Sequence, residues 1–141
     1  MALGRSRGGF SAKIHAAVLD EWTCASVEVT EGHAHDGRQF ETVWDRLPED
    51  NVIEAALLDR GYDADRIRDR LARDGVEAVI PPLESRCLKP PYDKERYKDR
   101  NQVERFFHKI KQFRRIATRY EKLRATFTAG VHIIAAFIAV K

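Results

Sequence analysis

An almost unbroken apolar run over residues 53–58 limits what this chain can fold into. Consecutive apolar residues, rather than alternating ones, are typical of a strand buried on both faces. Downstream, Asp63 can cap a helix over residues 64–74, Gly75 is placed to end it, and residues 77–80 form a second short strand. A helix between two such strands predicts a parallel pair, so we assign the chain to the α/β class.

The remaining sequence predicts further strands and helices around this unit. In chain order they are a loop over 4–9, a strand over 10–19, a turn at Asp20-Glu21, a strand over 25–30, a helix over 38–47, a long helix over 94–116 and an apolar helix over 125–140. The first two strands form a hairpin, so the sheet is expected to be mixed. The last helix is too short for a bilayer span, which needs about 20 residues, so we expect it to be buried in protein.

Length and composition exclude several classes of protein. A chain of 141 residues fits one domain. Arg5 and Arg7 interrupt the apolar stretch that a secretory signal needs after Met1. Cys24 and Cys87 stand far apart without a nearby second cysteine, which argues against a disulfide scaffold and against a four-thiol zinc site.

The net charge of +3 hides a strongly basic segment. Residues 1–84 contain 10 basic and 17 acidic side chains, whereas residues 85–124 contain 14 basic and 5 acidic ones. Aromatic residues are interleaved with the basic ones in this segment: Tyr92, Tyr97, Phe106, Phe107, Phe113 and Tyr120. Such a segment either binds a polyanion or forms a solvated helix face, and charge alone does not decide between these interpretations.

Asp59 is the first candidate for a functional side chain. It directly follows the buried strand, and ligand sites in open α/β sheets gather at the carboxyl ends of strands. A carboxylate at that place can hold a hard cation such as Mg²⁺. The alternative is that Asp59 only starts the turn at Gly61.

The long helix predicts a polar stripe that contains a second acid. Tyr97, Arg100, Glu104 and Lys111 fall within about 60° of arc at 100° per residue. Glu104 would therefore lie in a strongly basic neighbourhood. The alternative is an ordinary helical ion pair with Arg100, or a contact with His108.

These residues carry a resemblance to a known family. Tyr97-x2-Arg100-x3-Glu104-x6-Lys111 matches the Y-(2)-R-(3)-E-(6)-K signature of DDE transposases of the bacterial IS4 and IS5 insertion sequences. Three other stretches look like the IS5 group, namely residues 4–10 leading to 13–15, residues 59–63, and residues 104–107 running into 113–120. The resemblance covers nearly the whole chain in the expected order.

The resemblance implies an RNase H-like mixed sheet with flanking helices, with residues 1–141 forming part of the catalytic domain. It implies that Asp59 and Glu104 are the second and third catalytic acids and bind Mg²⁺ or Mn²⁺ for cleavage and transfer of DNA strands. Its partners would be the terminal inverted repeats and the target DNA, a second copy in the synaptic complex, and no membrane, in the bacterial cytoplasm. Residues assigned to DNA binding are Tyr97, Arg100, Lys111, Arg105, Arg114, Arg115, Arg119, Arg5 and Arg7.

The sequence departs from the family pattern at the first acid. In the family this aspartate ends the first central strand, upstream of the segment that matches residues 4–9. We therefore expect the sheet to lack that strand and its aspartate, and this chain alone to be inactive without an upstream transposase half. Asp20 is a minor alternative for the first acid, and Asp36 a weaker one.

Other functions remain open at this point. The chain could be a non-catalytic DNA-binding subunit or regulator derived from a transposase, or, less favoured by the signature, an RNase H-like nuclease without a role in transposition. Cys24, His33 and His35 form only a weak zinc pattern, and we expect ordinary loop and strand roles for them, with His35 and Asp36 near the site. His132 is expected to be a satisfied core residue or a helix-contact residue.

Overall fold

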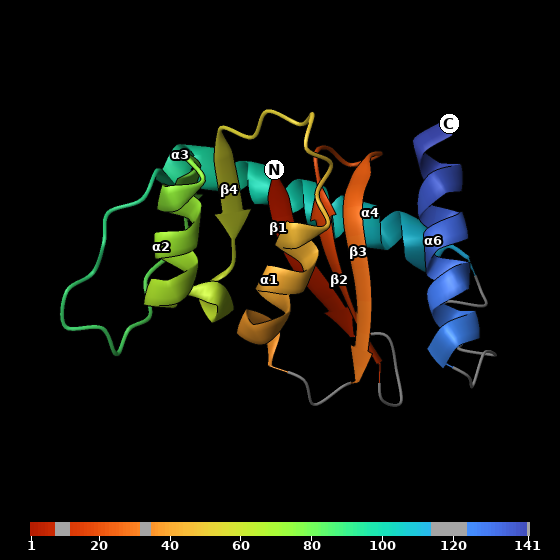
Figure 1. Cartoon of the computed structure of the whole chain (residues 1–141), viewed down its shortest axis with the longest axis horizontal. Helices are drawn as coiled ribbons and strands as arrows, with labels where there is room; N and C mark the ends of the chain where they lie inside the picture. Colours follow the sequence, from red (N-terminus) through yellow and green to blue (C-terminus); the bar gives the residue numbers. More distant parts are fainter. Residues whose placement is uncertain (8–11, 32–34, 114–123, 141) are drawn as a thin grey trace.

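A five-stranded mixed sheet in the order β3-β2-β1-β4-β5 organises the chain (Figure 1). The computed structural model describes residues 1–7, 12–31, 35–113 and 124–140. Strand β1 pairs antiparallel with β2 and parallel with β4, β2 pairs antiparallel with β3, and β4 pairs parallel with β5. The strands are β1 (Ala2–Arg7), β2 (Ala12–Val18), β3 (Cys24–Glu31), β4 (Ala55–Leu58) and β5 (Glu77–Val79).

Helices cover both faces of this sheet. They are α1 (Asp36–Asp45), the 3₁₀ turn η1 (Arg60–Tyr62), α2 (Asp65–Arg73), α3 (Lys94–Tyr97), the 3₁₀ turn η2 (Lys98–Arg100), α4 (Asn101–Lys111) and α6 (Arg124–Val140). The expected long helix is present as the consecutive elements α3, η2 and α4, and its predicted last residues, 114–116, lie outside the described residues. Each strand and helix expected between residues 10 and 113 is present within a few residues of its predicted ends.

Two apolar layers hold the helices on the sheet. On one face Val103, Phe106 and Ile110 of α4, together with the buried side of α6, pack on alternate residues of β2, β3 and β4. On the other face Phe40 and Trp44 of α1 and buried residues of α2 pack on the remaining side chains of β2 and β4. Figure 1 shows α4 crossing the strands behind the sheet and α6 beside β3. The expected mixed α/β sheet with flanking helices is confirmed.

The central strand position is filled, which differs from our expectation. Residues 4–7, predicted to be a loop, belong to β1, and β1 occupies the place where we expected the first central strand to be missing. Its six residues pair with β2 along their whole length and with β4 at two positions. The pairing partners on both sides impose the extended conformation, although the sequence ALGRSR shows no apolar alternation.

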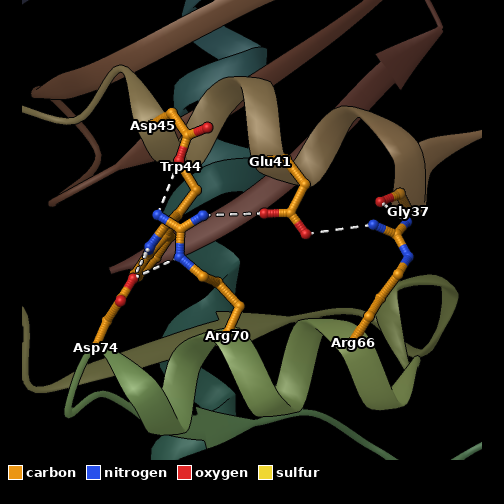
Figure 2. A network of polar contacts seen from close by, with 7 residues as sticks. All are labelled: Gly37, Glu41, Trp44, Asp45, Arg66, Arg70 and Asp74. Carbon is orange, nitrogen blue, oxygen red and sulfur yellow. Dashed lines mark hydrogen bonds and ion pairs between the residues drawn. The ribbon is translucent and has the colours of Figure 1, made fainter.

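Ion pairs join α1 to α2 over the second face (Figure 2). Arg70 donates to the carboxylates of Glu41, Asp45 and Asp74, at 3.2, 2.8 and 2.9 Å. The indole Nε1 of Trp44 also donates to Asp74, at 2.7 Å. One guanidinium therefore connects three carboxylates from both helices, which fixes the helices that cover β4.

Asp63 has a different role from the predicted helix cap. The N-cap of α2 is Ala64, without a side-chain hydrogen bond. The Asp63 carboxylate is fully buried and accepts hydrogen bonds of 2.7 Å from Arg68 Nε, Arg86 Nε and the Leu83 amide. It thereby ties the segment after β5 to the start of α2. The predicted end of α2 is confirmed, since Gly75 follows it with a φ of +72°.

Candidate active site at the carboxyl end of β4

Asp59 lies where the sequence predicts it, directly after β4. Its Oδ1 accepts a hydrogen bond from the Gly61 amide at 2.7 Å, and its Oδ2 lies 3.4 Å from Nη2 of Arg100. A Cβ on Gly61 would come within 2.9 Å of Asp59 Oδ1, so glycine lets the backbone approach this carboxylate. Asp59 therefore does start the turn, but it also faces the long helix, and the two interpretations hold together.

Arg100 joins the two predicted catalytic acids. Its Nη2 approaches Asp59, and its Nη1 lies 3.2 Å from Oε1 of Glu104. The Arg100 side chain is only 19% exposed, and its Nε is buried without a hydrogen-bond partner among the described residues. The predicted helical ion pair of Glu104 with Arg100 is thus present, and the same guanidinium extends it to a carboxylate 45 positions earlier in the chain.

Glu104 reaches this place because of how α4 packs. Val103, Phe106 and Phe107 are buried against the sheet, which leaves Glu104 on the solvent side with 66% of its side chain exposed. Tyr97 is half-buried and stacks edge to face on Tyr92, with ring centroids 5.7 Å apart. Burial raises the pKa of the Tyr97 hydroxyl, and the nearby guanidinium of Arg100 acts in the opposite direction.

The structure brings Tyr97, Arg100 and Glu104 to Asp59 and leaves Lys111 farther away. Lys111 is exposed at the end of α4, about 10 Å along the helix axis from Glu104. The 3₁₀ turn η2 winds more tightly than an α-helix, so the stripe is not a single straight row. Its central part, around Arg100, is the part that faces the candidate site.

The other residues expected to bind DNA have different positions. Arg105 lies on α4 and pairs with Glu21 of the β2–β3 turn at 3.7 Å, close to Lys109, whose ion pair lowers the pKa of Glu21. Arg5 and Arg7 lie on β1, and the positions of their side chains are not described. Arg114, Arg115 and Arg119 lie outside the described residues.

An open hollow runs along α4 beside Glu104. It measures about 470 Å³, and its lining residues are Glu21, Asn101, Glu104, Arg105, His108, Lys109 and Gln112. Lys109 also lies 4.0 Å from the ring centroid of Trp22, which is 45% exposed. Cationic and aromatic side chains thus extend from Glu104 along the outer side of the helix.

The first acid has a definite place in the strand register, and no acid stands there. Ala2 pairs with Leu57 and Leu3 with Leu58, so the next residue, Gly4, is level with Asp59. None of the six residues of β1 is acidic. The register therefore locates the position at which the family pattern expects an aspartate.

Asp20 is not an alternative first acid in this structure. Its carboxylate accepts hydrogen bonds from the backbone amides of Trp22 and Thr23, at 2.7 and 2.8 Å, and so caps the turn. It follows Val18, which pairs with Ala2 at the opposite end of β1 from Arg7. The turn therefore lies at the other edge of the sheet from Asp59.

Asp36 lies close to the site, as expected, although it was the weaker alternative for the first acid. Its Oδ2 would be 3.9 Å from a Cβ on Gly61, which is the same point that Asp59 Oδ1 approaches. Its Oδ1 lies 3.6 Å from Nζ of Lys13. The sequence analysis did not place Lys13 near Asp36 and Asp59. Lys13 lies on β2 and Asp59 follows β4, so only the assembled sheet brings them to the same edge.

The donor set fits a divalent cation in its chemistry. Carboxylate oxygens are the ligands that Mg²⁺ prefers, and one or two of them with water molecules are sufficient for this ion. Asp59 and Glu104 provide two, and both contact the guanidinium of Arg100. Within the described ranges no group of three or more His, Cys, Asp or Glu residues is arranged to bind a metal.

The zinc pattern finds no support in the described part of the chain. Cys24 is partly buried, and burial raises its pKa to about 12, which disfavours the thiolate that zinc requires. His33 lies outside the described residues. His132 is exposed on α6 and is thus not a core histidine.

Among the described helices, none is long and apolar enough to cross a membrane.

Comparison with solved structures defines the class of fold. The chain is similar to the catalytic core domain of BIV integrase, with a TM-score of 0.63 over 96% of this chain and 79% of that one. The identity of 14% limits this likeness to the fold. The fold is therefore RNase H-like, as expected.

Sequence comparison then shows the family. The model of the transposase DDE domain matches residues 3–139. A putative transposase for insertion sequence element IS6501 from Brucella ovis is 34% identical over 127 residues, which are 89% of this chain and 95% of that protein. The chain belongs to the DDE transposase family.

Proposed function

We propose that this chain is the catalytic core of an insertion-sequence transposase of the IS5 group, which cleaves DNA at transposon ends and transfers the strands to target DNA. The observation that carries the proposal is the pairing of Asp59 and Glu104 through Arg100 at the carboxyl end of β4. Asp59 and Glu104 come from distant segments and both contact the largely buried guanidinium of Arg100. Membership of the DDE transposase family supports a catalytic role for these two acids.

Asp59 and Glu104 are the residues that would hold Mg²⁺ or Mn²⁺. When bound, the ion would activate a water or a 3′-hydroxyl and stabilise in-line displacement at a DNA phosphate. Without a cation, Arg100 contacts both carboxylates and offsets one of their two negative charges. A cation on the carboxylates would leave its guanidinium available for a DNA phosphate, with which it can form two parallel hydrogen bonds.

The basic residues are proposed to hold DNA along the long helix. Tyr97 and Lys111 flank Glu104 in sequence and would contact the DNA backbone at the transposon end. Arg105 lines the hollow beside Glu104 and would contact the adjacent phosphates. The same sequence-independent role is proposed for Arg114, Arg115, Arg119, Arg5 and Arg7.

We further propose that the site needs another carboxylate for full activity. The described part of β1 supplies none at the level of Asp59, where the family pattern has its first acid. An upstream transposase half would supply it, and two copies would assemble on paired transposon ends in the bacterial cytoplasm. The isolated chain is then expected to be a poor catalyst.

The test is strand cleavage on duplex DNA that carries the transposon end, with Mg²⁺ or Mn²⁺, with and without the upstream half. We expect activity in the combined sample, and we expect Asp59→Asn and Glu104→Gln to abolish it. Asp69→Asn is a matched control, because Asp69 is an exposed aspartate on α2. Strong nicking by the pure chain that depends on Asp59 and Glu104 would overturn the incompleteness.

A non-catalytic DNA-binding regulator is the second candidate. The observation that favours it is the lack of a three-residue metal group among the described residues. In that case Asp59→Asn and Glu104→Gln would leave repression or DNA binding intact, and neither variant would change divalent-cation binding. DNA affinity alone does not separate the two functions, because the basic segment predicts steep salt dependence in both.

A further inference from the structure

Trp22 is an exposed aromatic side chain on the turn between β2 and β3. It is 45% exposed, whereas the second tryptophan of the sequence, Trp44, is 6% exposed and donates its indole N–H to Asp74. An indole on the surface forgoes the stabilisation that its burial would bring. A single exposed aromatic residue is nevertheless common, so its surroundings decide whether it has a role.

Hydrogen bonds of the turn fix the backbone that carries this indole. The Asp20 carboxylate accepts from the amides of Trp22 and Thr23, at 2.7 and 2.8 Å. The Leu19 amide donates to the Thr23 carbonyl at 2.9 Å. Because the turn is already ordered, a ligand that contacts the ring does not have to order the backbone beneath it.

Two cations of α4 lie beside the ring. Nζ of Lys109 is 4.0 Å from the ring centroid of Trp22 and donates to Oε2 of Glu21 at 2.6 Å. Arg105, one turn earlier on α4, lies 3.7 Å from Oε1 of the same glutamate. One carboxylate of the turn therefore holds two cations next to the indole, and these three side chains together carry a positive charge.

The hollow along α4 connects this turn with the candidate active site. The turn lies at the opposite edge of the sheet from Asp59, but α4 crosses behind the strands (Figure 1), and the lining of the hollow includes both Glu104 and Glu21. Lys109 is five residues after Glu104, which is about 7.5 Å along the helix axis. Phosphates of one strand repeat every 3.4 Å or so, and Trp22 therefore lies roughly two or three nucleotides from a phosphate at Glu104.

A nucleic-acid base fits these surroundings better than a protein partner. An indole can stack on any base, and neighbouring cations attract the phosphates on either side of that base. A base inside a duplex is already stacked on both sides, so the ligand would be an unpaired one. A protein partner would favour a contiguous apolar surface, whereas the side chains that line the adjacent hollow are polar or charged.

We infer that Trp22 is a base-stacking residue, which binds an unpaired base of a DNA strand that runs along α4 from Glu104. This inference rests on the proposed function, because it assumes that DNA lies along this helix. It goes further by placing a base contact on the β2–β3 turn, whereas the proposed function places only backbone contacts on α4. Stacking is tolerant of base identity, so the contact should add affinity without sequence preference.

Tryptophan fluorescence reports this contact directly. Trp44 is buried and contributes a constant background, which Trp22→Phe measures. A duplex with an unpaired end of about three nucleotides, the reach estimated above, should quench the emission of the unmodified chain. The same duplex with abasic sites in that end keeps the phosphates and should leave the emission unchanged. Equal quenching by both DNAs would show a response to charge alone and would overturn the inference.

Fluorescence anisotropy of the two labelled DNAs measures the contribution of stacking to affinity. Trp22→Leu should weaken binding of the duplex with the unpaired end about tenfold, the size of one base–aromatic stack, and should not change binding of the abasic duplex. Trp22→Phe should retain most of the affinity. Leu88→Ala is the matched control, because Leu88 is an apolar side chain that is 86% exposed between β5 and α3, and it should change neither value.

The failures of the two proposals are distinguishable. If neither DNA binds the unmodified chain, the proposed function fails and the inference fails with it. If both DNAs bind with equal affinity and without quenching, only the role of Trp22 is wrong. An equal loss of affinity for both DNAs in Trp22→Leu would show a disturbed turn rather than a lost stack, and would also overturn the inference. Thermal unfolding of each variant shows whether it is folded before binding is compared.

Discussion

Asp63→Asn tests how much one buried carboxylate contributes to this fold. Asp63 is completely buried and receives three hydrogen bonds of 2.7 Å, two of them from arginines. Asparagine has nearly the same shape, but its amide group cannot accept from both guanidinium groups. Arg68 and Arg86 are only 14% and 21% exposed, so the substitution leaves two partly buried charges without their partner.

Breaking a buried ion pair from one side costs about 3–5 kcal/mol. Because both arginines keep some contact with water, we expect the lower end, about 3 kcal/mol of the free energy of unfolding. For a chain of this size that corresponds to a decrease in Tm of roughly 10 °C. Urea unfolding at pH 7, followed by far-ultraviolet circular dichroism, measures the loss.

The pH dependence provides an independent check. Burial raises the pKa of Asp63, but the Leu83 amide, Arg68 and Arg86 outweigh it and hold the pKa below its usual range. A lowered pKa in the folded state stabilises the protein above the unfolded value of about 3.9, and this contribution is lost as the pH falls through the folded pKa. The difference between Asp63→Asn and the unmodified chain should therefore shrink below about pH 4.

Asp69→Asn is the control for Asp63→Asn, because it removes an exposed aspartate from the same helix. It should change the free energy of unfolding by no more than about 0.5 kcal/mol. A loss below about 1 kcal/mol for Asp63→Asn would refute the reasoning, as would a difference that stays constant from pH 7 to pH 3.

Three further predictions concern other contacts. Arg70→Met should lower the free energy of unfolding by about 1–2 kcal/mol in urea titration, because three carboxylates lose a guanidinium that is only 25% exposed; an unchanged midpoint would contradict this. Gly61→Ala should weaken Mn²⁺ binding in calorimetry about tenfold or more, since its Cβ would displace the Asp59 carboxylate, and equal affinity would show that this carboxylate is not a ligand. A thiol reagent at pH 8 should label the exposed Cys87 first and Cys24 only on unfolding, because burial raises the pKa of Cys24 to about 12.

Local sequence patterns predicted most of the fold. The apolar run before Asp59, the glycine after α2 and the apolar periodicity of α4 each depend on neighbours within one or two turns, and each element is present. Strand β1 was missed because its conformation depends on pairing with β2 and β4. Of these two strands, β4 is distant in the sequence. A segment of this composition gives no local signal for a strand.

The site was predictable in part. Two local patterns predicted the pair of acids that Arg100 connects. They are the spacing of Arg100 and Glu104 on one helix and the position of Asp59 at the end of a strand. The role of Asp63 was mispredicted, because a capping pattern is local whereas two of its three partners, Leu83 and Arg86, are 20 and 23 residues away. Asp36 was expected near the site, and its position beside Asp59 results from the chain returning at α1 to the edge where β4 ends.

The strand register explains why the number of acids in this sequence is a poor guide to activity. A third carboxylate is useful only if it reaches the same ion as Asp59. Gly4 pairs with Ala16, which belongs to the core under α4, so position 4 lies level with Asp59 and on the face from which Glu104 approaches. Asp20 is at the wrong edge of the sheet, and Asp36 approaches from the other face. The place of the first acid is therefore defined by β1, and an aspartate supplied by another chain would have to displace β1 from this central position or reach the site beside Gly4.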